Sequence, residues 1–122
     1  MIRKSMGSCI GGLSIATLFV MGALNTAMAA DAWWTGNLKF VYPLGDGSFV
    51  LGFTSDVGTP CQNASTPIKY YTITPGQYGV TLDGAKAMLA TALTAFAMDK
   101  QITAAFDPAS ANCYVNRFQV VQ

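Results

Sequence analysis

Four aromatic residues occur as two adjacent pairs, Trp33-Trp34 and Tyr70-Tyr71. Tryptophan and tyrosine combine a large apolar ring with a polar group, and both are enriched where proteins bind ligands or partners. Neighbouring side chains of an extended chain point to opposite faces, so one member of each pair should face away from the core. We therefore take Trp33, Trp34, Tyr70 and Tyr71 as the candidate ligand-binding residues. The alternative for the tryptophans is that one fills the core and the other lies on its rim.

The other reactive residues offer little for catalysis. The chain has no histidine, which excludes the Ser-His-Asp and Cys-His arrangements. All six acidic residues are aspartates, and most of them stand at predicted turns or caps, where aspartate has structural roles. These are Asp46, Asp56, Asp83 and Asp107. No Cys or His cluster suggests zinc, and no glycine-rich phosphate loop follows a strand. The sequence predicts a protein that is not an enzyme and that uses no metal and no cofactor.

The first 29 residues have the three-part pattern of a secretory signal peptide. Arg3 and Lys4 precede an apolar run over 10–24, and small residues then lead to a cleavage site after Ala29. A transmembrane anchor, the alternative, needs about 20 apolar residues, whereas this run is shorter and is interrupted by glycines. We predict export to the periplasm or the extracellular space, with no stable membrane insertion after cleavage.

The 93 residues that remain over 30–122 are enough for a single domain. This part has five basic and six acidic residues, so its net charge is −1. A nucleic-acid-binding protein would carry a basic patch, and we therefore expect no nucleic-acid partner.

Two cysteines, Cys61 and Cys113, remain after cleavage. In an oxidising compartment a single intramolecular pair is expected, and closing this loop would stabilise the fold by about 4 kcal/mol. A reactive thiol is the alternative, but the sequence has no Cys-x-x-Cys motif and no histidine to activate one. The sequence predicts a structural disulfide.

The spacing of apolar residues predicts five strands and one helix. The strands are expected over 33–44, 48–55, 68–74, 102–106 and 113–121. In the first strand, one face should carry Leu38, Phe40, Tyr42 and Leu44. The helix is expected over about 82–99, capped by Thr81 or Asp83. Its core-facing stripe should contain Ala85, Leu89, Leu93 and Phe96, widened by Met88, Ala92 and Ala95.

The resulting order, β-β-β-α-β-β, is typical of an OB-fold, a five-stranded barrel that is mostly β with one helix. An α+β sandwich of another topology is the alternative. The order places the paired aromatic residues on the first and third strands, where they would face the barrel interior and its outer surface in turn.

The stretch Trp34-Thr35-Gly36 and the helix over 86–99, with its tight turn into a strand, give the chain a family resemblance. It resembles the small secreted B subunits of AB5-type toxins, of the subtilase-cytotoxin and typhoid-toxin kind. That resemblance implies an OB-fold, pentameric rings and binding of sialylated glycans. The family's Tyr-Tyr-Ser glycan-binding triplet is not present, because this region has Phe40-Val41-Tyr42. The helix and the following strand also look like short secreted bacterial proteins with two cysteines.

Together these features predict a non-catalytic binding module with a glycan or protein ligand, and a homo-oligomer is compatible with this function. One alternative is a periplasmic structural or inhibitor-like protein with one protein partner. Another is a toxin-like B subunit.

Overall fold

The computed structural model describes residues 30–122, and the predicted signal peptide over 1–29 lies outside the described residues. The described part is a mostly-β α+β fold in the predicted order β-β-β-α-β-β. Its elements are β1 (Ala32–Pro43), β2 (Phe49–Phe53), β3 (Tyr71–Ile73), α2 (Leu82–Ala97), β4 (Gln101–Phe106) and β5 (Val115–Val121). All five predicted strands and the predicted helix are therefore present, although β3 is shorter than expected.

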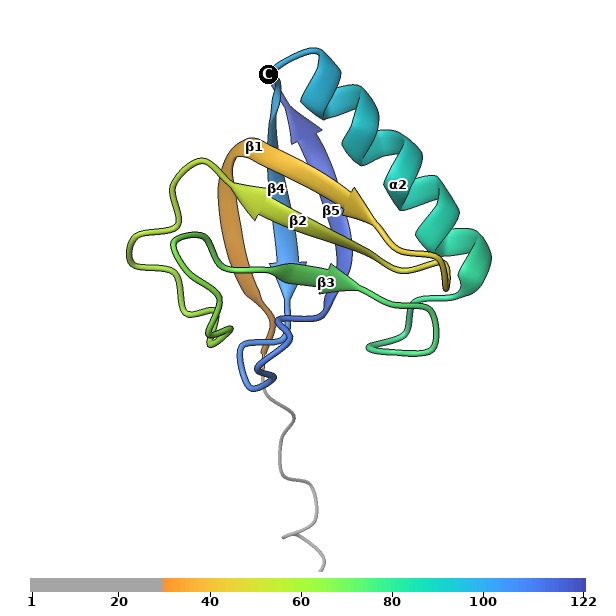
Figure 1. The fold of residues 1–122 in the computed structure, drawn as a ribbon, viewed down its shortest axis with the longest axis horizontal. Coiled ribbons are helices and arrows are strands. Elements are labelled where there is room, and N and C mark those ends of the chain that lie inside the picture. The colour runs from red at the N-terminus through yellow and green to blue at the C-terminus, as the bar shows by residue number, and fades with distance from the viewer. Residues whose placement is uncertain (1–29) are drawn as a thin grey trace, which may run out of the picture.

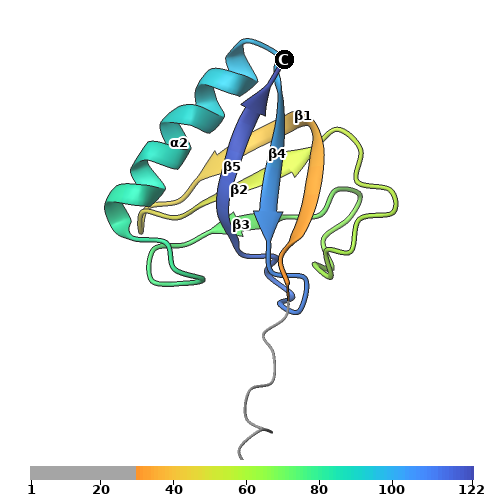
Figure 2. The same cartoon turned by 180° about the vertical axis from the view of Figure 1, so that it is seen from behind.

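The five strands form one antiparallel sheet in the order β3-β2-β1-β4-β5 (Figure 1). The long first strand belongs to both halves of this sheet, since its first half pairs with β4 and its second half with β2. It bends strongly between the two, so that β4 and β5 run steeply across β2 and β3 (Figures 1 and 2). No ladder joins β3 to β5 within residues 30–122, and the sheet is open at these two edges.

A β-bulge between Leu38 and Phe40 changes which side chains of β1 face the core. A bulge adds one residue to a strand and so inverts the inward and outward alternation beyond it. Leu38 is buried and Val41 packs against the core, whereas Tyr42 is 49% exposed. The prediction of one face with Leu38, Phe40, Tyr42 and Leu44 is therefore wrong.

The core is built around Tyr71, which has no exposed surface. Its ring makes edge-to-face contacts with Phe53 and Phe106, at centroid distances of 5.0 and 5.1 Å. Its hydroxyl donates to Thr59 Oγ1 at 2.7 Å, which satisfies the polar end of the side chain. Burial raises the pKa of this phenol to about 12, so Tyr71 is a neutral core residue at any physiological pH.

Helix α2 lies along one side of the sheet (Figure 2). It begins at the predicted cap, Thr81, whose hydroxyl accepts from the N–H of Gly84 at 2.9 Å. Its fully buried side chains are Ala85, Ala92 and Ala95. Two members of the predicted stripe, Leu93 and Phe96, are 44% and 45% exposed. That part of the prediction is wrong, whereas Ala85, Ala92 and Ala95 are buried and Leu89 packs against the core, as predicted. The helix packs mainly through these small alanines, and this leaves Leu93 and Phe96 partly in solvent.

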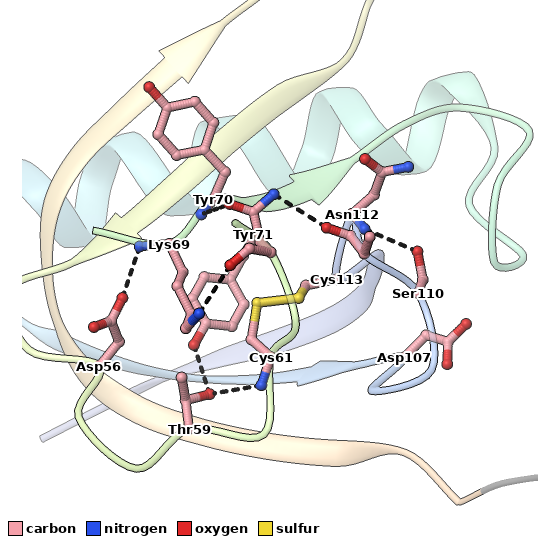
Figure 3. Close-up of a disulfide and its surroundings, with 12 residues drawn as sticks. Asp56, Thr59, Cys61, Lys69, Tyr70, Tyr71, Asp107, Ser110, Asn112 and Cys113 are labelled. Carbon is pink, nitrogen blue, oxygen red and sulfur yellow. Dashed lines mark hydrogen bonds between the residues drawn. A yellow bond between two sulfur atoms is a disulfide. The ribbon is translucent and has the colours of Figure 1, made fainter. Parts of the chain in front are cut away.

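The disulfide between Cys61 and Cys113 is present, as the sequence predicts (Figure 3). It joins the β2–β3 loop to the segment that enters β5, with a Cα–Cα distance of 5.7 Å. Asn63 adds a second tie, because its side-chain amide donates to the carbonyl of Ala111 at 3.1 Å. The N–H of Thr72 in β3 lies 3.3 Å from the carbonyl of Cys113. The two unpaired edges of the sheet are therefore held together at one end.

Among the described residues, no helix has the length and hydropathy needed to cross a membrane.

Candidate functional site

The four candidate aromatic residues divide equally between the surface and the interior. Trp33 is 49% exposed and Tyr70 is 37% exposed. Trp34 is partly buried against the core, and its indole N–H donates to the carbonyl of Ser55 at 3.1 Å. Tyr71 is a core residue, and Figure 3 shows its ring beside the disulfide with the hydroxyl pointing to Thr59, while the Tyr70 ring points the other way. The surface candidates are therefore Trp33 and Tyr70.

Trp33 stands in a row of three residues that crosses the outer face of the sheet. It lies opposite Ala105 of β4, and Ala105 lies opposite Arg117 of β5. The small alanine between them lets the two long side chains meet, with Arg117 Cζ 4.9 Å from the centroid of the Trp33 ring. This is cation–π geometry. The two side chains cover Ala105, which has no exposed surface although it points outward.

The guanidinium of Arg117 is also held by a carboxylate from the start of the described chain. Its Nη2 lies 2.9 Å from Asp31 Oδ2, and its Nη1 donates to Asn116 Oδ1 at 2.9 Å. The phenol of Tyr78 donates to the other oxygen of Asp31. This hydrogen bond, helped by Arg117, lowers the pKa of the Asp31 carboxyl against the opposing effect of burial. The same bond raises the pKa of Tyr78 to about 12. At neutral pH the Arg117 charge is therefore balanced.

Neutral polar side chains occupy the next row of the same outer face. Thr35, Thr103 and Gln119 lie opposite one another on β1, β4 and β5. The hydroxyls of Thr35 and Thr103 share a hydrogen bond of 2.8 Å, and Gln119 is exposed. We call the surface made by Trp33, Thr35, Thr103, Arg117 and Gln119 the Trp33 face.

An open pocket of about 170 Å³ lies beside the Trp33 ring, lined by Trp33, Arg117, Phe118 and Gln119. It is smaller than the clefts of about 300 Å³ or more that enclose drug-sized ligands. It has room for part of one small ring or for the end of a longer ligand, so a larger ligand would also have to contact the surface around it.

A second aromatic surface lies on the other half of the sheet. Phe40 and Tyr70 contact each other edge to face, with their ring centroids 5.6 Å apart. Gly52 of β2 lies opposite Phe40, and the absence of a side chain there lets the Phe40 ring lie over it. Tyr42 continues this surface along β1. We call Phe40, Tyr42 and Tyr70 the Phe40 patch. Trp33 and Tyr70 thus belong to two separate surfaces.

No protein-family model, curated protein or solved structure matches this chain.

The aspartates serve the local backbone. Asp46 accepts hydrogen bonds from the N–H and the hydroxyl of Ser48. Both bonds lower the pKa of the Asp46 carboxyl, and the bond from the hydroxyl has the larger effect. Asp56 accepts the N–H of Lys69 at 2.7 Å, and Asp107 that of Ala109 at 2.9 Å. Within residues 30–122, no three His, Cys, Asp or Glu side chains come together as a group that would hold a metal ion.

Sequence analysis missed most of the partners that organise the Trp33 face. Asp31 and Arg117 are 86 positions apart, and only the strand register brings them together. Tyr78 lies in the turn before α2, where its backbone has a φ of 55°. That conformation is uncommon for a bulky residue, and no sequence pattern marks it. Phe40 and Tyr42 were predicted to share a face with Leu38, and the bulge turns them to the outer face instead.

Proposed function

We propose that this protein is an exported, non-catalytic binding module built on an OB-like barrel, and that it binds its ligand on the Trp33 face. The observation that carries this proposal is the Trp33 ring, which is half-exposed and yet held in place. Arg117 fixes the ring from one side through a guanidinium that Asp31 and Asn116 hold in turn. A preorganised aromatic side chain loses little conformational entropy on binding, as a binding site requires.

The strand order supports the barrel. An OB-fold is a five-stranded and partly open barrel, and β3 and β5 are the edges that would meet on closure. The disulfide and the contact of Thr72 with Cys113 already bring these edges together at one end. The disulfide also supports export, since such bonds persist in oxidising compartments. The lack of histidine and the structural roles of the aspartates support a protein without catalytic activity.

A comparison of two variants tests the proposed site. Trp33→Ala removes the ring from the Trp33 face, and Tyr42→Ala removes an equally exposed ring from the Phe40 patch. Each exported protein would be presented to a glycan array and to cell-envelope extract. We expect the ligand retained by the wild type to be lost from Trp33→Ala and kept by Tyr42→Ala, with both variants unfolding near the wild-type temperature. A ligand that Trp33→Ala retains in full would refute the proposed site.

The Phe40 patch favours a second candidate, a structural or inhibitor-like protein with one protein partner. Exposed aromatic rings are common among the residues that dominate protein interfaces, and this patch carries Phe40, Tyr42 and Tyr70 together. Under this candidate the two variants exchange roles, so that Tyr42→Ala loses the partner and Trp33→Ala keeps it.

A toxin-like B subunit would also have to form a homo-oligomer. The half-exposed Leu93 and Phe96 on α2 offer apolar surface for such contacts. The mass of the protein in solution, measured by light scattering, distinguishes this candidate from a monomer.

A further inference from the structure

We infer that the ligand of the Trp33 face is an uncharged saccharide. This inference rests on the proposed function, in which the Trp33 face is the binding site, and it adds the chemical class of the ligand. Three properties of the surface lead to it: its exposed ring, its balanced charge and its supply of neutral hydrogen-bonding groups.

The exposed ring provides a stacking surface for a sugar. A pyranose ring has faces of C–H groups, which pack against an aromatic ring and leave the hydroxyls at the sugar's edge free to bond. Trp33 keeps 49% of its surface exposed while Arg117 holds it in place. The small open pocket beside Trp33, lined also by Arg117, Phe118 and Gln119, has room for the edge of one sugar ring, and the exposed indole offers a surface for its face.

The charge balance disfavours an acidic ligand. Arg117 is the single charged residue of the Trp33 face, and its guanidinium already lies 2.9 Å from the Asp31 carboxylate. A sialic acid, sulfate or phosphate group would have to approach beside that carboxylate, where a second negative charge is repelled. Since Asp31 also receives the Tyr78 phenol and has a lowered pKa, it stays ionised at neutral pH.

The neutral polar row matches the hydroxyls of a sugar. Thr35 and Thr103 use one hydroxyl hydrogen between them, so the pair keeps one donor and several acceptor lone pairs for a ligand. The Gln119 amide adds two donors and an acceptor, and Gln119 is exposed. Sugar hydroxyls donate and accept, so they can satisfy both kinds of group. A protein partner would instead be expected to bury a larger apolar centre than one indole.

The test is an array of neutral oligosaccharides ending in glucose, galactose, mannose or N-acetylglucosamine, each printed beside a sialylated or sulfated form. We expect the exported wild-type protein to bind neutral members, with at least a tenfold loss for Trp33→Ala and little change for Tyr42→Ala. Gln119→Ala should weaken binding by roughly two- to tenfold, the range for one lost hydrogen bond. Trp33→Phe keeps an aromatic face and should retain part of the affinity, which maintains the test should Trp33→Ala unfold.

Asp31→Asn tests the role of charge. This substitution leaves the Arg117 guanidinium without its counterion, so sialylated and sulfated glycans should gain binding relative to their neutral forms. An unchanged ratio would contradict the electrostatic part of the inference.

The failures can be told apart. If the wild type binds only sialylated or sulfated glycans and loses them in Trp33→Ala, the ligand class is wrong and the proposed site stands. If it binds no glycan of either kind, the inference is overturned. The proposed function is then decided separately, by whether the wild type captures a ligand from cell-envelope extract that Trp33→Ala does not. Neutral glycan binding that survives Trp33→Ala in full overturns both.

Discussion

Replacing Gly52 by alanine tests how the outer surface of β2 is covered. Gly52 lies opposite Phe40 across the β1–β2 ladder. A Cβ added at Gly52 would stand 2.8 Å from Cδ2 of Phe40 and closer still to Cε2 and Cζ of the same ring. Carbon atoms in favourable contact are about 3.5–4.0 Å apart, so the ring must move outward and away from its contact with Tyr70.

The expected loss of stability follows from two opposing effects. Overpacking of this kind costs about 1–3 kcal/mol, including the edge-to-face contact with Tyr70, which is worth about 0.5–1.5 kcal/mol by itself. Alanine in a strand recovers roughly 0.5–1 kcal/mol relative to glycine. We expect Gly52→Ala to lower the free energy of unfolding by about 1–2 kcal/mol. For a domain of this size, that corresponds to a fall in melting temperature of roughly 5–15 °C.

Urea unfolding of the oxidised protein measures this change. Gly45→Ala is a matched control, because an added Cβ there has no neighbour within 4 Å, and its stability should equal or exceed that of the wild type. The decisive background is Phe40→Ala, in which Gly52→Ala should no longer destabilise the protein. Equal losses in the presence and absence of the Phe40 ring would refute the steric reasoning, and so would a Gly52→Ala protein as stable as the Gly45→Ala control.

Three further changes probe the rest of the fold. Replacing both Cys61 and Cys113 by serine should lower the free energy of unfolding by about 4 kcal/mol in urea titration, and a variant as stable as the oxidised wild type would contradict this. Tyr71→Phe removes one hydrogen bond and keeps both ring contacts, so we expect a loss of about 1 kcal/mol; a loss as large as that of Tyr71→Ala would show that the hydroxyl matters more than the ring. The pKa of Asp31 is lower in the folded protein than its ordinary value near 3.8. The ionised Asp31 carboxyl therefore stabilises the fold above that ordinary pKa, and this stabilisation disappears as the pH falls through the pKa of the folded state. The wild type should therefore unfold at a higher temperature than Asp31→Asn at pH 7, and the difference should vanish at strongly acidic pH.

Local chemistry accounts for the elements that sequence analysis located. A hydroxyl cap begins α2 at Thr81 because it satisfies a free N–H, and this requires only nearby residues. The disulfide was predictable because Cys61 and Cys113 are the two cysteines outside the predicted signal peptide, and two cysteines allow a single pairing. The core side of α2 was harder to predict, since alanine occurs all around the helix. How deeply each helix side chain is buried then depends on how closely the sheet approaches the helix. Ala92 is buried, whereas the larger and more apolar Leu93 beside it is 44% exposed.

The candidate site depended on long-range register, which sequence periodicity does not contain. One extra residue in β1 turns Phe40 outward, and no residue type marks the bulge in the sequence. The meeting of Trp33 with Arg117 requires three strands in register and a small side chain at Ala105. The sequence could predict that one member of each adjacent pair, Trp33-Trp34 and Tyr70-Tyr71, faces outward. It could not predict which neighbouring residues would surround each exposed ring.

The bond between Cys61 and Cys113 also bears on aggregation. Edge strands present unpaired N–H and C=O groups, which are templates for intermolecular β-pairing. In the described part of the chain, β3 and β5 are such edges, and the disulfide fastens the loop beside one to the segment entering the other. A chain that has not yet been oxidised would leave both edges free to separate and to recruit strands from other molecules. The timing of disulfide formation during folding would then govern how much of the protein escapes such pairing.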